Sequence, residues 1–338
     1  MKGEFELIGN IRSRFGQSGP GTGGGAALPD GVTGIGDDCA IMPQRDGTDT
    51  LVSTDLLVEG IHFLLDDISA RDLGWKAAAV NISDIAAMGG RPVATFLSIA
   101  IPSSISEEWI DEFMEGYAEI SSRYGVALLG GDTTSSAAGL CINVAVVGEC
   151  VHGKAVRRSG ARPGDLVCVT GMLGDSAAGL KLILEGCREA VCGQDAEPSQ
   201  CRLNAAERTL LRRHHRPEPQ VSAGIALAGS GAVSAMMDIS DGVASDLRHI
   251  MEESGVGAEI LTALVPLSQE LVDVCAARFW DAMQLALEGG EDYQLLFTVE
   301  PSAEASLGVP HTVIGRMTED KNLVWNGSDR DFRGFTHF

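Results

Sequence analysis

The stretch SARDLGWKAAAVNISDIAAMGG, residues 69–90, predicts a helix that leads directly into an aliphatic strand at 94–101. Ser69 can cap this helix and Asp72 stands at its third position, which is typical of a helix start. Apolar residues then recur at helical spacing, at Leu73, Ala77, Val80 and Ile85. Gly89-Gly90 predicts the end of the helix, so helix and strand form one α/β unit.

The segments around this unit also alternate between helix and strand. A second helix is expected over about 106–124, with Gly125 as its terminator, and strands are expected at 50–53, 126–129 and 141–147. The turn signal Arg162-Pro163-Gly164-Asp165 opens a new half of the chain. That half predicts a strand at 166–170, a helix at 175–184, a strand before Asp238, a helix at 242–253 and strands at 293–299 and 311–317.

The length of 338 residues fits two domains of roughly 100–200 residues each. We expect an α/β (α+β) fold with domains at 1–150 and 151–338. Hydrophobic residues make up 44% and charged residues 21%, as in ordinary globular proteins. The net charge of −22 opposes binding to nucleic acids and anionic membranes, and the apolar stretches are far shorter than the ~20 residues of a membrane helix.

The N-terminus and the cysteines both favour a cytoplasmic location. Residues 1–6 lack the basic-then-apolar order of a secretory signal. The eight cysteines are scattered and form no CxxC pair, which favours free thiols over a disulfide framework or a zinc site.

Most of the acidic residues of interest stand where predicted strands meet loops, among glycine, serine and threonine. They are Asp37, Asp38, Asp55, Asp84, Asp132, Asp238, Asp241, Glu291 and Asp292. Strand ends are rigid and accessible positions for ligand-binding groups. Oxygen ligands without His or Cys pairs favour magnesium, manganese or calcium, and so many acids indicate several ions.

Capping is the competing interpretation of each acid, because an Asp after a strand is more often a helix cap or an Asx turn than a metal ligand. Ser240 and Asp241 can both be explained as caps of the helix at 242–253. Asp84 cannot, since it stands late in its helix, where an acid opposes the helix dipole. We therefore expect another partner for Asp84.

Common phosphate-binding motifs are missing from the sequence. There is no GxxxxGK[ST], no protein-kinase motif set and no GxSxG elbow. The glycine-rich segment 16–31 contains a GxGxxG match without a preceding strand, so we interpret it as a flexible loop. The polar segment 187–220, with its basic run 212–216, is interpreted as a solvated helix-and-loop region rather than an anion site. Any phosphoryl transfer must then depend mainly on metal ions and positioning.

Several segments together resemble the thiamine-monophosphate kinase family of the aminoimidazole ribonucleotide synthetase-like superfamily. In chain order they are Gly34-Ile35-Gly36-Asp37-Asp38, Ser53-Thr54-Asp55 with Gly60-Ile61-His62, residues 81–89, Gly130-Gly131-Asp132-Thr133-Thr134, residues 158–165, residues 174–180, Asp238-Ile239-Ser240-Asp241-Gly242 and Gly289-Gly290-Glu291-Asp292. The resemblance covers nearly the whole chain except 16–31 and 187–205.

This resemblance implies a fold and a reaction. The first domain's strands would build a barrel across a homodimer, beside a C-terminal α/β domain. The γ-phosphate of ATP would pass directly to thiamine monophosphate to give thiamine diphosphate, with several Mg²⁺ ions. No covalent nucleophile or general base is implied, because the attacking oxygen belongs to an ionised phosphate.

The resemblance also implies roles for individual residues, carried over by matching position. Magnesium ligands are expected at Asp38, Ser53, Thr54, Asp55, Asp84, Asp132, Asp238 and Asp241. ATP contacts are expected at Gly131, Asp132, Arg158 and Ser240. Contacts with thiamine monophosphate are expected at His62, Glu291 and the C-terminal aromatic residue Phe332.

Two alternatives remain beside this reading. One is another ATP-dependent ligase or synthetase of the superfamily, against which His62 argues because the synthetase pattern has a Gly-Thr-Lys element in that region. The other is a non-catalytic protein that binds metal or nucleotide. Product formation separates the kinase from both.

Overall fold

The computed structural model describes residues 37–44, 47–187 and 203–335. The glycine-rich segment 16–31 and Gly34-Ile35-Gly36 lie outside these residues. Within them, no helix is both long and apolar enough to cross a membrane.

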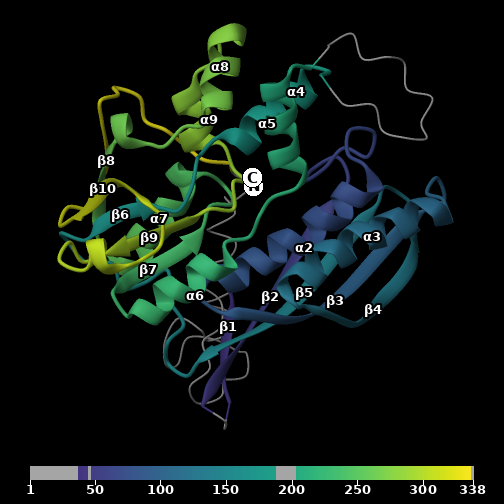
Figure 1. Ribbon diagram of the computed structural model, residues 1–338, viewed down its shortest axis with the longest axis horizontal. Coiled ribbons are helices and arrows are strands. Elements are labelled where there is room, and N and C mark those ends of the chain that lie inside the picture. The colour runs from purple at the N-terminus through teal and green to yellow at the C-terminus, as the bar shows by residue number, and fades with distance from the viewer. Residues whose placement is uncertain (1–36, 45–46, 188–202, 336–338) are drawn as a thin grey trace.

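The first half of the chain forms a five-stranded sheet. Its strands lie in the order β1 (Ala40–Pro43), β2 (Thr48–Val58), β5 (Cys141–Val151), β3 (Arg91–Pro102) and β4 (Ala127–Ser136). All neighbours are antiparallel except β3 and β4, which are parallel. Helices α2 (Ala70–Ala87) and α3 (Glu107–Tyr124) cover one face (Figure 1). The other face exposes Leu56 and Phe96, and β4 is exposed along nearly its whole length.

Helix α2 is the most enclosed helix near the site, and its neighbours approach its backbone closely. A Cβ at Gly74 would lie 1.9 Å from the Phe113 carbonyl oxygen of α3, and one at Gly224 of α6 (Val221–Ser230) would lie 2.1 Å from the Ala86 carbonyl oxygen. Only glycine permits these distances, so α2 is buried between α3 and α6.

The second half forms a six-stranded sheet. Its strands lie in the order β11 (Leu323–Asn326), β8 (Gly257–Leu261), β10 (Thr312–Thr318), β6 (Leu166–Val169), β9 (Leu295–Val299) and β7 (Val233–Asp238). Only β11 and β8 are parallel neighbours. Helix α7 (Val243–Ser254) packs on one face and α6 on the other, so every residue of β9 is buried. Helices α4 (Asp175–Leu184), α5 (Ala205–His215), α8 (Gln269–Arg278) and α9 (Ala282–Glu288) gather beside this sheet (Figure 1).

The expected mixed α/β fold is confirmed. Both first-half helices begin and end as predicted: Ser69 accepts a hydrogen bond from the Asp72 N–H, and Gly125 ends α3 with φ +67°. Strands β2 and β4 extend well beyond 50–53 and 126–129. The first sheet ends at Val151 and the second begins at Leu166, and the domain division at 150/151 stays a prediction. The barrel across a homodimer stays a prediction, because a single chain gives an open sheet.

The cysteine prediction is correct for five residues and wrong for one. Cys39, Cys141, Cys150, Cys168 and Cys275 are free thiols. Cys187 is disulfide-bonded.

Candidate functional site

A cavity of about 890 Å³ lies between α2, β2 and the helices and loops of the second half. Apolar residues such as Leu57, Val80 and Leu184 form part of its wall. The remaining wall is strongly acidic in one region and carries Lys76 and two histidines in another. Both regions contain residues that the sequence nominated.

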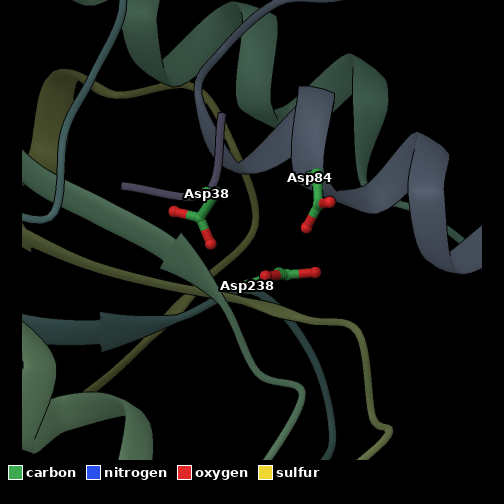
Figure 2. Close-up of side chains that lie close together, drawn as sticks. All are labelled: Asp38, Asp84 and Asp238. Carbon is green, nitrogen blue, oxygen red and sulfur yellow. The ribbon is translucent and has the colours of Figure 1, made fainter. Parts of the chain in front are cut away.

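Three carboxylates converge in the acidic region, and we call Asp38, Asp84 and Asp238 the acidic cluster. One carboxylate oxygen from each lies within 4.8 Å of the others. Figure 2 shows the three side chains pointing toward one another from different elements: the segment before β1, the end of α2 and the end of β7. The Ser53 hydroxyl donates to Asp84 at 2.5 Å, and the Ser83 hydroxyl donates to Asp238 at 2.5 Å.

Burial and repulsion between neighbouring acids raise the pKa values of Asp84, Asp238 and the nearby Asp55. Burial, together with the charges of Asp55 and Asp238, raises the pKa of Asp84 well above its ordinary value. Burial and the Asp38 charge raise the pKa of Asp238 to about 8 and that of Asp55 to about 6. A bound cation would reverse this effect, because it favours the ionised form of each acid.

Arg158 and the Asp37-Asp38 pair form one wall of the acidic region. The Arg158 guanidinium makes two bonds to Asp38, from Nη2 to Oδ1 at 2.8 Å and from Nε to Oδ2 at 3.2 Å. Asp37 instead accepts the backbone N–H of Arg158 at 2.6 Å, and burial raises its pKa to about 6. The two neighbouring acids thus differ: Asp38 faces the cluster, whereas Asp37 anchors a loop.

Ser240 and Asp241 also line the cavity, at the turn between β7 and α7. The N-cap of α7 is Gly242, which makes no side-chain capping bond. The Asp241 N–H donates to Asp246 at 3.3 Å, so the first turn of α7 orients the Asp241 backbone.

Three other nominated residues lie outside the cavity of this chain. Thr54 follows Ser53 in β2, so its side chain lies on the opposite face of the sheet, where it donates to the Val144 carbonyl oxygen at 3.0 Å. Gly131 and Asp132 lie on exposed β4, and neither contributes to the cavity wall.

His62 and Glu291 both line the cavity, as the sequence nominated. The His62 Nδ1 accepts the Val58 N–H at 3.0 Å, in the turn after β2. Glu291 adopts a left-handed φ of +62°, and its Oε2 lies 2.9 Å from Lys76 Nζ and 3.2 Å from His214 Nδ1.

The nomination of Phe332 as the aromatic residue at the substrate is wrong for this structure. Phe332 is only 2% exposed and packs edge-on against Trp325 in the core of the second half. Phe335, from the same C-terminal segment, does line the cavity; it is 50% exposed, and its N–H donates to the Asp241 carbonyl oxygen at 3.0 Å. A Phe that fills the core cannot stack on a ligand.

Sequence reasoning also missed Lys76, His214 and His215, all of which line the cavity. The histidines belong to the 187–220 segment, which was interpreted as solvated. A signal was present, because Asn204 and Glu207 form a capping box that marks the start of α5. Burial lowers the pKa of His215 to about 3 and that of His214 well below its usual value, so both imidazoles are neutral at pH 7.

Family models match both halves of the chain. Residues 36–150 match the AIR synthase related protein, N-terminal domain, and residues 162–326 match the AIR synthase related protein, C-terminal domain.

Similar proteins match at full length. The chain is 39% identical to the thiamine-monophosphate kinase of Salmonella typhimurium (strain LT2), over 99% of this chain and 98% of the relative. It is also 39% identical to that of Bacillus subtilis (strain 168), over 90% and 93%. The solved structure "AaThiL complexed with AMPPCP and TMP" matches with a TM-score of 0.84 and 34% identity, over 99% of this chain and 97% of that one. The chain therefore belongs to the AIR synthase related protein family and, within it, to the thiamine-monophosphate kinases.

Proposed function

We propose that this protein transfers the γ-phosphate of ATP directly to thiamine monophosphate, giving thiamine diphosphate and ADP. The observation that carries the proposal is the acidic cluster in a large cavity of a chain whose full-length relatives are thiamine-monophosphate kinases. A related structure with an ATP analogue and TMP supports the two substrates.

The residues of the acidic cluster fit Mg²⁺. All the donor atoms are carboxylate or hydroxyl oxygens, and a bound cation would offset the burial and repulsion that raise the pKa of Asp84 and Asp238. Asp38, Asp84 and Asp238 would hold the ions, with Ser53, Asp55 and Asp241 nearby in the cavity wall. Bound Mg²⁺ would neutralise phosphate charge, so that two anionic substrates can approach.

The chain's own residues position the reactants. Arg158 is held by Asp38 and lines the cavity, where its guanidinium can pair with phosphate oxygens of ATP, and Ser240 also lines the cavity. His62, Glu291 and Phe335 would contact thiamine monophosphate, with Phe335 in the role assigned by sequence to Phe332. No general base is required, since the attacking phosphate oxygen is already ionised. Positioning of this kind can lower a barrier by roughly 7–11 kcal/mol.

Gly131, Asp132 and Thr54 require a different explanation, because they lie outside the cavity. We propose that two chains pair through the exposed face of the first sheet, so that Gly131 and Asp132 of the partner subunit reach the nucleotide. The exposed Leu129, 64% accessible on β4, supports such a contact. Leu129→Asp should convert the dimer to a monomer in light scattering, together with a loss of turnover. A wild-type protein that is monomeric at assay concentrations would contradict this arrangement.

The direct test of function is to incubate the purified protein with thiamine monophosphate, ATP and Mg²⁺. Chromatography should reveal equal amounts of thiamine diphosphate and ADP. If ADP formed without thiamine diphosphate, another ATP-dependent reaction of the superfamily would be supported. If neither formed over a range of pH and divalent metals, the protein would be a binding protein rather than a kinase.

A further inference from the structure

Lys76 is a buried cation that the proposed reaction does not yet use. It lies in α2, is 1% exposed, and lines the cavity. It stands eight residues before Asp84, which is a rise of about 12 Å along the helix. Burying an ammonium is costly unless it is paired, and the Lys76 Nζ donates to Glu291 Oε2 at 2.9 Å. This pair joins the first half of the chain to the second.

Glu291 is held from three directions. Its own N–H donates to the Ser240 carbonyl oxygen at 2.8 Å and fixes the backbone, which has a left-handed φ of +62°. Lys76 approaches the carboxylate from α2. His214 approaches from α5, with Nδ1 at 3.2 Å from Oε2 and at 3.0 Å from the Ser176 hydroxyl of α4.

His214 is a neutral neighbour of Glu291 in this network. Burial, and then the positive charge of Lys76, lower its pKa well below the usual value. Its Nδ1 is hydrogen-bonded with the Ser176 hydroxyl at 3.0 Å and lies 3.2 Å from Glu291 Oε2. Lys76 and His214 therefore approach the same oxygen, and Lys76 donates a hydrogen bond to it.

The two oxygens of Glu291 are thus unequal. Lys76 and His214 both approach Oε2, and within the described residues no hydrogen bond reaches Oε1. The side chain is 26% exposed and lines the cavity. Oε1 is therefore the acceptor that remains for a ligand.

We propose that Lys76 and His214 are positioning residues that aim Glu291 Oε1 at the exocyclic amino group of the substrate's aminopyrimidine ring. The carboxylate accepts that amino N–H, and the Lys76 ammonium holds the carboxylate in place. This inference rests on the proposed function and extends it to recognition of the vitamin's ring.

The first test is steady-state kinetics of Lys76→Met, which keeps the length of the side chain and removes the charge. We expect the KM for thiamine monophosphate to rise about tenfold while the KM for ATP stays within about twofold, because loss of a charged hydrogen bond weakens one substrate only. Lys154→Met, which removes an exposed lysine outside the cavity, is the matched control. An unchanged KM for thiamine monophosphate, or an equal rise in both KM values, would overturn the proposal.

The second test asks whether Lys76 acts through Glu291. If it does, Lys76→Met combined with Glu291→Gln should be no worse than Glu291→Gln alone. Oxythiamine monophosphate, which has a carbonyl in place of the amino group, should be a poor substrate for the wild-type protein. Its KM should rise little further in Lys76→Met. The assignment would be contradicted if the two substitutions multiplied their effects on the KM in the double variant. It would also be contradicted if Lys76→Met raised the KM for the oxo analogue as much as it raises the KM for thiamine monophosphate.

His214 provides a variant set that leaves the buried lysine in place. His214→Asn keeps a donor near the position of Nδ1, whereas His214→Leu does not. We expect His214→Asn to restore most of the affinity for thiamine monophosphate that His214→Leu loses, with equal kcat values. Equal losses in both variants would reject the role of His214. Wild-type protein that forms no thiamine diphosphate would reject the proposed function itself, which is a separate outcome from any of these.

Discussion

The acidic cluster and the surroundings of Glu291 use carboxylates in opposite ways within one cavity. In the acidic cluster, Asp38, Asp84 and Asp238 face one another, and Arg158 is ion-paired to Asp38. At Glu291, one carboxylate faces a buried lysine and a neutral histidine. The first arrangement has too few cations for its acids, whereas the second supplies its own cation.

This difference indicates which part of the substrates each region receives. Buried acids that repel one another retain protons until a cation arrives, as the raised pKa values of Asp84 and Asp238 show. At Glu291, Lys76 already supplies a positive charge, and the Oε1 atom suits a neutral hydrogen-bond donor. Substitutions in the acidic cluster should therefore change turnover, and substitutions around Glu291 should change affinity for the vitamin.

The largest effect is expected for Asp84→Asn. The amide can still accept the Ser53 hydroxyl but brings no charge to bound cations, so kcat should fall about a thousandfold, the loss typical of a transition-state charge contact. The metal-free melting temperature should not fall, because burial already favours a neutral side chain here. Asp111→Asn, an exposed change on α3, is the control for turnover and melting. Retention of more than a tenth of wild-type kcat would remove Asp84 from the metal site.

Magnesium should stabilise the folded protein through the same cluster. At a concentration 100 times its dissociation constant, a ligand of the native state adds about 2.7 kcal/mol to the free energy of unfolding. We expect MgCl₂ to raise the melting temperature of wild type and of Asp111→Asn, and to have little effect on Asp238→Asn. NaCl at matched ionic strength controls for screening of the net charge of −22. The comparison fails if Asp238→Asn responds as strongly as wild type.

How far sequence reasoning reached depends on whether the deciding contacts are local. Helix α2 was predicted closely because its cap, its periodicity and its final glycines lie within 22 residues. The need of Asp84 for a distant partner could be inferred from its place late in that helix. The pairing of Lys76 with Glu291 joins residues 215 positions apart, and a lysine between alanines is more often a surface residue whose charge stays in water.

Phe332 and Phe335 show that non-local contacts also decide between two residues that are close together in the sequence. Both belong to one short C-terminal segment, and either could be the aromatic residue of the site. Packing against Trp325 places Phe332 in the core, and a backbone bond to Asp241 places Phe335 in the cavity wall. These contacts depend on β11 and α7, so residue type and spacing could not distinguish the two phenylalanines.

A moderate effect is expected for Glu291→Gln, which tests the region around Glu291 in the comparison of the two regions. The KM for thiamine monophosphate should rise about tenfold, as expected for loss of one charge-assisted hydrogen bond, while kcat stays within about threefold. Initial rates over a range of both substrates separate the two constants. A kcat loss as large as that of Asp84→Asn would place Glu291 with the metal ligands and remove the distinction between the two regions.

The last test concerns Asp292, which lies next to Glu291 yet makes no ion pair within the described residues. Its carboxylate accepts the N–H groups of Gly174 and Ser176 at the start of α4, at 2.7 and 3.3 Å. Burial raises its pKa to about 8, despite these hydrogen bonds and with a further contribution from the Asp175 charge. Asp292 therefore tests how the protonation of an acid in this loop changes with pH when no lysine is paired with it.

Between about pH 4 and pH 8 the folded protein retains a proton on Asp292 that the unfolded chain has released. The contribution of Asp292 to the free energy of unfolding therefore falls as pH rises through this window, by at most about 1.4 kcal/mol per pH unit, and becomes level above pH 8. Asp292→Asn does not titrate, so its stability relative to wild type should increase from pH 5 to pH 8. Urea unfolding of both proteins at each pH, without divalent metal, measures this difference. If the free energies of unfolding of the two proteins changed in parallel with pH, Asp292 would be ionised in the folded protein. The start of α4 alone would then replace the cation that Glu291 obtains from Lys76.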